Sequence, residues 1–158
     1  MAKDNPIPGS ELVPIQQMIT FRTARLSARL AAQAARILKE SSGLTLMQWR
    51  ILIQIHGKGS TTQSEMVRLT QVDKAQVSRT LKHMLEQGLV ASEVNESDHR
   101  VHFVRLTDKG ADLLQRAWPT MTERRKRLHN SLSAKEQEAF FDTIQKIEAM
   151  IDEMEDER

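Results

Sequence analysis

Three helix starts, followed by a change of hydrophobic period, constrain the fold of this chain more than any other feature. Residues 45–48, 62–65 and 73–76 read Thr-x-x-Gln, Thr-x-x-Glu and Asp-x-x-Gln. In such patterns the first side chain caps a helix, and the fourth can reach back to it. Only Gln71-Val72 separates the second helix from the third, and Gly88 marks the end of the third. The spacing therefore predicts three successive helices, the last two joined by a tight turn.

After Gly88 the apolar residues no longer recur at helical spacing. Residues 89–95 and 101–106 are short, alternating segments with β-branched side chains, and the polar segment 96–100 lies between them. This pattern predicts a two-stranded β-hairpin. A hairpin alone is marginally stable, so it must pack on the preceding helices. Helix, tight turn, helix and hairpin in this order are typical of a winged helix-turn-helix.

Long helical segments flank this central region on both sides. Residues 15–41 are rich in Ala, Leu and Arg, which favour a helix, and two apolar faces indicate burial from two sides. Thr107 caps a further helix, which Pro119 should kink or break. The last helix begins at Ser133-x-x-Glu136, another capping box.

The last helix carries an apolar seam whose steps of four and three residues are typical of a helix–helix interface. The seam consists of Phe140, Ile144, Ile147, Ile151 and Met154. Together with the first helix it exposes too much apolar surface for a monomer, so we expect a homodimer. The expected fold is mainly α (α+β): a flexible segment 1–14, a dimerisation helix 15–43, a winged helix-turn-helix 44–110 and dimerisation helices 111–158.

The net charge of the 158 residues is only +2, but the charges are segregated. Basic residues dominate between Arg22 and Arg50 and in the run 124–127, whereas the last helix is mostly acidic. Such segregation suits a polyanion-facing surface, although solvated helix faces give the same pattern. The absence of cysteine excludes disulfides and thiolate metal sites. With no membrane-length apolar run and no signal-peptide pattern, we expect a cytoplasmic protein.

The polar side of the predicted helix 73–87 suits the major groove of DNA. Its apolar stripe consists of Val77, Leu81, Met84 and Leu85. The opposite side presents Lys74, Ala75, Gln76, Ser78, Arg79 and Lys82. Arg and Gln pair with guanine and adenine edges, Lys and Ser reach bases or phosphates, and Ala lets the backbone approach. The preceding helix offers free N–H groups and short side chains to a phosphate at Thr62, Gln63 and Ser64.

The tip of the predicted hairpin carries Asp98, His99 and Arg100. An arginine on a projecting loop suits the narrow, negative minor groove. Alternatively, Asp98 and Arg100 form a surface ion pair that only stiffens the turn. The two interpretations are compatible, because Asp98 can orient the wing while Arg100 inserts.

Two motifs of the central region carry a resemblance to a known family. Asp98-x-Arg100 followed by Leu106-Thr107-x-x-Gly110 is similar to the wing signature of the MarR family of multiple-antibiotic-resistance-type regulators, although Val101 departs from the usual small residue. Similarity to its recognition helix and strand entry lies in Val77-Ser78-Arg79, Leu81, Leu85-Glu86 and Gly88-Leu89-Val90. The resemblance covers residues 45–110. It implies an obligate dimer on a pseudo-palindromic operator, usually a repressor, released by a small aromatic or anionic ligand.

For such an effector, the resemblance implies a crevice between the dimerisation helices and the winged helix. The candidate ligand-binding residues are Met18, Arg22, Trp49 and Ile53. Arg22 interrupts an apolar stretch, so it is placed to meet a carboxylate. In the alternative interpretation, Trp49 belongs to the core and Arg22 is a solvated or intersubunit ion-pair residue.

Two other classes of function are weighed against a sequence-specific regulator. The first is a protein-interaction module on the same scaffold, with the acidic last helix as partner surface and weak or non-specific DNA binding. An enzyme is disfavoured, because no Gly-rich phosphate loop, nucleophile elbow or carboxylate pair in an apolar pocket appears. The five histidines lack ligand spacing, so neither a metal nor another cofactor is expected.

Overall fold

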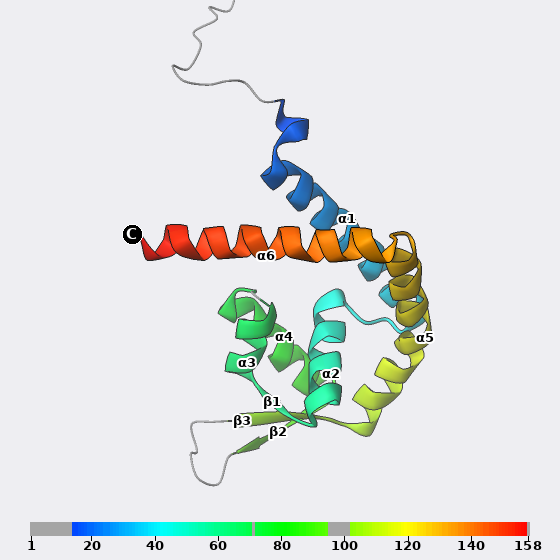
Figure 1. The fold of residues 1–158 in the computed structure, drawn as a ribbon. Coiled ribbons are helices and arrows are strands. Elements are labelled where there is room, and N and C mark those ends of the chain that lie inside the picture. Colours follow the sequence, from blue (N-terminus) through cyan, green and yellow to red (C-terminus); the bar gives the residue numbers. More distant parts are fainter. Residues whose placement is uncertain (1–13, 71, 95–101, 158) are drawn as a thin grey trace, which may run out of the picture.

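A computed structural model describes residues 14–70, 72–94 and 102–157, which form a mainly helical fold with a small sheet at one end (Figure 1). The elements are the 3-10 turn η1 Ile15–Gln17, α1 Ile19–Ser41, α2 Leu46–Lys58, β1 Thr61–Thr62, α3 Gln63–Thr70, α4 Lys74–Glu86, β2 Val90–Val94, β3 His102–Leu106, α5 Asp108–Asn130 and α6 Ala134–Asp156. This order confirms the predicted mainly helical winged helix-turn-helix.

Side-chain caps begin the helices where the sequence predicts them. Thr45 Oγ1 accepts a hydrogen bond from the Gln48 backbone N–H, and Gln48 Oε1 accepts one from the Thr45 N–H. The Asp73 carboxylate accepts from the backbone N–H groups of Ala75 and Gln76 at the start of α4. Each cap satisfies donors that a helix end leaves unpaired, and contributes about 1 kcal/mol. These caps therefore fix the entry points of α2 and α4.

The sheet has three antiparallel strands in the order β1-β3-β2, one strand more than predicted. β2 and β3 form the predicted hairpin, with Val90 opposite Leu106. The third strand, β1, comprises only Thr61–Thr62 and pairs with the middle of β3. Two residues carry no alternation that a sequence pattern can detect, which is why β1 was missed.

The hydrophobic core lies between α2, α4 and the sheet, and α1, α3 and α5 add residues to it. Its buried residues are Leu38, Leu44, Trp49, Ile51, Leu52, Ile55, Met66, Val77, Leu81, Met84, Leu89, Val90, Val104, Leu114 and Ala117. α4 buries only Val77, Leu81 and Met84. Leu85, predicted to belong to the same stripe, is 40% exposed. The buried side of α4 is therefore narrower than its apolar pattern suggested.

The outer helices α1, α5 and α6 bury little of their surface in the single chain. α1 buries Ala34 and Leu38, and α6 buries no residue. Of the kink or break predicted at Pro119, the break does not occur, because α5 runs through this residue without interruption. Pro119 and Gln115, whose carbonyl loses its donor, are both exposed, so water can satisfy that carbonyl.

A junction of close contacts holds the end of α4 against the start of α5. Gly88 adopts a φ of 66°, ends α4 as predicted, and turns the chain into β2. Thr107 Oγ1 donates to the Gly88 carbonyl at 2.7 Å and accepts from the Gly110 N–H at 3.1 Å. A Cβ on Gly110 would overlap the carbonyl oxygen of Leu89. The close approach of the two backbones therefore requires glycine at position 110.

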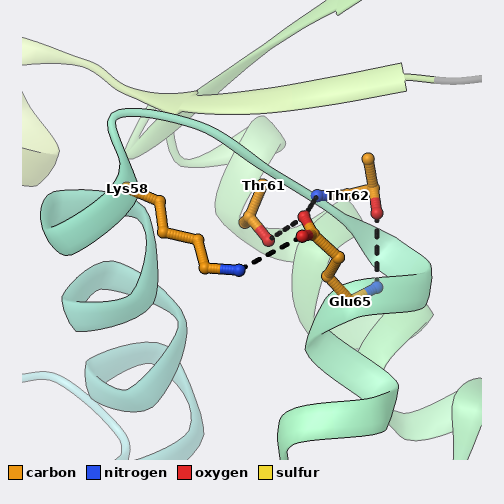
Figure 2. Close-up of polar contacts among 4 residues, drawn as sticks. All are labelled: Lys58, Thr61, Thr62 and Glu65. Atoms are coloured by element: carbon orange, nitrogen blue, oxygen red, sulfur yellow. Dashed lines mark hydrogen bonds and ion pairs between the residues drawn. The ribbon is translucent and has the colours of Figure 1, made fainter.

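The Glu65 side chain joins the end of α2, β1 and the start of α3 (Figure 2). It accepts hydrogen bonds from the Thr62 N–H at 3.1 Å and the Thr61 hydroxyl at 3.0 Å, and pairs with Lys58 Nζ at 3.2 Å. The Thr62 hydroxyl accepts from the Glu65 N–H, which completes the predicted capping box. The backbone bond from Thr62, then the bonds from Lys58 and Thr61, lower the pKa of Glu65 below its ordinary 4.5.

Substituting Gly110→Ala should destabilise the fold by about 1–3 kcal/mol, because the new Cβ forces α5 away from Leu89. Urea unfolding of the purified protein measures the difference. Gly57→Ala is the matched control, since Gly57 lies in α2 with open space around its missing Cβ. We expect the control to be neutral or stabilising. Equal effects of the two substitutions would contradict the steric explanation.

The Glu65 contacts should make stability acid-sensitive in one direction. Because the folded pKa lies below 4.5, the stabilisation is complete above that pH and is lost as the pH falls through the lowered folded value. Glu65→Gln should therefore be less stable than wild type at neutral pH. The difference between the two proteins should shrink steadily below pH 4.5. Thermal unfolding of both proteins across this range provides the measurement, and a difference that grows in acid would refute the assignment.

Candidate nucleic-acid interface

Every side chain predicted for the groove-facing side of α4 is exposed. These residues are Lys74, Ala75, Gln76, Ser78, Arg79 and Lys82. Among the described residues, none of the three cations on this side has an acidic partner. α4 thus presents three unneutralised positive charges beside small and amide side chains. This chemistry suits phosphates and base edges.

The first turn of α3 offers less to a phosphate than predicted. The Thr62 N–H is not free, because it donates to the Glu65 carboxylate. That carboxylate brings a negative charge to the same turn, which Lys58 balances in part. Ser64 is exposed and Gln63 is half-buried. Any contact between this turn and a phosphate would therefore depend on Gln63 and Ser64 more than on Thr62.

The described part of the wing is stiffened by cross-strand polar contacts. Arg105 Nε of β3 pairs with the Glu93 carboxylate of β2 at 2.8 Å, and both side chains are exposed. Ser92 Oγ lies 3.4 Å from His102 Nδ1 on the same hairpin. The predicted tip residues Asp98, His99 and Arg100 fall outside the described residues, so their role stays a prediction. Cross-strand pairs of this kind hold the hairpin in register.

The four predicted ligand residues do not share one cavity. Trp49, 7% exposed, lines a cavity of about 470 Å³ between α1, α2 and α5. Arg22 lines another of about 480 Å³ between α1 and α6, and Ile53 one of about 460 Å³ between α2 and α3. Met18 is exposed at the end of η1. Ile53, expected at the same crevice as Trp49, is 36% exposed.

Two arginines that the sequence did not single out for a ligand reach the cavity at Trp49. Arg50 of α2 and Arg124 of α5 both line it, beside Leu46 and Met121. Arg124 donates to the Gln33 side chain at 3.1 Å and to a backbone carbonyl of α1 at 3.0 Å. α1 and α5 are far apart in sequence, so no local pattern places Arg124 at this position.

The described residues contain no cluster of three or more side chains able to hold a metal ion. Their helices also include none with the length and apolar character needed to cross a membrane.

Comparisons with known proteins agree with this geometry. Residues 42–101 match the model of the MarR family. The uncharacterized HTH-type transcriptional regulator YdgJ of Bacillus subtilis is 24% identical over 114 residues, which are 72% of this chain and 70% of that protein. The MarR-family regulator Sco3205 of Streptomyces coelicolor, solved in complex with DNA, superposes with a TM-score of 0.78 at 18% identity, covering 89% of this chain and 93% of that one.

A further structural relative is the PcaV transcriptional regulator of Streptomyces coelicolor, solved with its natural ligand. Its TM-score is 0.72 at 19% identity, and the match covers 89% of this chain and 98% of that one. The likeness in fold thus extends from the winged helix into the outer helices. The proteins matched are transcriptional regulators rather than enzymes. The winged helix of this chain is thus similar to that of the MarR family over residues 42–101, and the whole described fold is that of the transcriptional regulators on which it superposes.

Proposed function

We propose that the protein is a homodimeric repressor that inserts one α4 of each subunit into successive major grooves of a pseudo-palindromic operator. The observation that carries this proposal is the two-sidedness of α4. Three apolar side chains anchor it, while its polar side is entirely exposed. Bound over a promoter in the cytoplasm, such a dimer blocks transcription. The two recognition helices need centres about 34–36 Å apart.

The exposed seam of α6 supports the dimer. Phe140, Ile151 and Met154 are 44%, 48% and 57% exposed, and Ile144 and Ile147 are only half-buried. A continuous apolar row of this length is seldom left in water by a monomeric protein. A second copy related by a two-fold axis would cover it, and would bring the two winged helices to one side of the DNA.

We also propose an effector site in the cavity at Trp49. Leu30, Leu46 and Met121 form apolar walls, and Arg50 and Arg124 supply two guanidinium groups. This combination suits a small aromatic carboxylate. The cavity lies between the outer helices and α2, so a bound ligand favours one arrangement of these parts over another. If the favoured arrangement changes the spacing of the two α4 helices, the dimer releases DNA.

Arg79→Ala should weaken binding to the selected operator by about 1–3 kcal/mol and relax the preference at one base pair. The operator is first selected from a random duplex library, and binding is then followed by fluorescence anisotropy. Arg116→Ala, which removes an exposed cation of α5, is the matched control. If wild type selects no preferred sequence, the repressor proposal fails, and the result supports the alternative of a protein-interaction module. Equal affinities of wild type and Arg79→Ala would rule out the docking of α4.

An aromatic carboxylate should change the fluorescence of Trp49 and release DNA. The chain has two tryptophans, so Trp118→Phe leaves Trp49 as the sole reporter. Benzoate and its hydroxylated derivatives are the probes, and the neutral benzamide is the control. Arg50→Ala should weaken carboxylate binding about tenfold, since it removes a charge-assisted hydrogen bond. A response to benzamide equal to that of benzoate would exclude the guanidinium contact.

A further inference from the structure

One side of α1 carries a row of arginines with no acidic neighbour. Arg22, Arg25 and Arg29, here called the arginine row, recur at helical spacing and are exposed. The apolar residues Ile19 and Leu26, 65% and 47% exposed, run along its edge. No acid precedes Glu40 in α1. Within the described ranges, none of these guanidinium groups forms an ion pair.

The far half of α6 carries the opposite pattern. Glu148, Asp152 and Glu155, here called the acidic edge, are exposed and flank the apolar seam on one side. These carboxylates likewise have no cationic partner in the part of the chain that the structure describes. Like charges held in line repel one another, so each row is stabilised by a complementary row.

The acidic edge does not meet the arginine row of its own chain. Phe140 and Ile144 line the cavity beside the arginine row, so α6 crosses α1 at its own first turns. Beyond this crossing α6 continues toward the C-terminus and leaves α1 behind (Figure 1). With a rise of about 1.5 Å per residue, the acidic edge begins about 6 Å past Ile144 and ends about 17 Å past it.

We propose that the acidic edge of one copy lies against the arginine row of the other copy in the homodimer. This inference rests on the dimer of the proposed function and names the contact that sets its register. A second copy is the occupant because the same chain carries both charge patterns, and each pattern borders an exposed apolar row. A two-fold axis forms the contact twice. The charged borders act as flanking residues do beside a coiled-coil seam, selecting the partner and its orientation.

Two charge-reversed chains test the contact. The first carries Arg22→Glu, Arg25→Glu and Arg29→Glu, and the second carries Glu148→Lys, Asp152→Lys and Glu155→Lys. A homodimer of either chain opposes like charges at both contacts, so its dissociation constant should rise about tenfold or more. The two chains mixed should form a heterodimer of near wild-type affinity, because both contacts are then complementary. Native mass spectrometry of differently tagged chains measures the amounts of homodimer and heterodimer. Sedimentation equilibrium measures their dissociation constants.

Control chains carry two reversed acids or one reversed cation, changes of the same kind as in the test chains, away from the contact. Asp142→Lys with Glu153→Lys reverses acids on the side of α6 opposite the seam, and Lys39→Glu reverses a cation of α1 outside the arginine row. These controls should dimerise like wild type. The proposal is overturned if the reversed chains dimerise like wild type, or if mixing them yields no preferred heterodimer.

Binding of wild type to the selected operator, read in parallel, separates the two proposals. A wild-type dimer that binds operator while the mixed chains fail to pair overturns only the charge contact. A wild-type dimer that binds no DNA, with preferred heterodimers in the mixture, overturns only the repressor proposal.

Discussion

Burial of Val77, Leu81 and Met84 against α2 and the sheet is the contact on which the candidate interface depends. Each fully buried side chain of this kind contributes about 1.5–3 kcal/mol, enough to dock a short helix without help from its other side. The buried Gln48 of α2 adds a hydrogen bond of 2.9 Å to Gln87, just past the end of α4. The fold therefore does not depend on contacts from the polar side of α4, and the side chains on that side are available to contact DNA.

The same helix is tied to the outer helices through its C-terminal end. Gly88, Thr107 and Gly110 bring the strand entry and the first turn of α5 into backbone contact. Lys109 Nζ adds a hydrogen bond of 2.8 Å to the Gln87 carbonyl. α4 and α5 thus meet at one junction of close contacts rather than across a flexible linker. The position of α4 therefore depends on the position of α5.

Features with a local cause were predictable, and features with a distant cause were not. The caps at Thr45, Asp73 and Ser133 follow from side chains three or fewer residues away, and the structure contains each of them. β1 depends on pairing with β3 some forty residues later. The exposure of Leu85 likewise depends on how α4 settles on the core.

The candidate site likewise has one part that the sequence predicts and one part that it does not. The exposed face of α4 could be predicted, because helical period alone separates it from the apolar stripe. The cavity at Trp49 could not, since it draws Arg124 from a helix about ninety residues away from α1. The residues that line it are brought together only by tertiary packing. Met18, Arg22 and Ile53, which the family resemblance suggested beside Trp49, do not line this cavity.

The unbroken course of α5 has a mechanical consequence. Its 23 residues form a rod about 35 Å long, running from the Gly110 junction to the start of α6. Tilting a rod of that length by about 5° displaces its end by about 3 Å, roughly the width of a single hydrogen-bonded contact. Side chains around the pivot adjust by far less. A repacking near one end of α5 that tilted it by this amount would move α4, which is held at the other end, by about 3 Å.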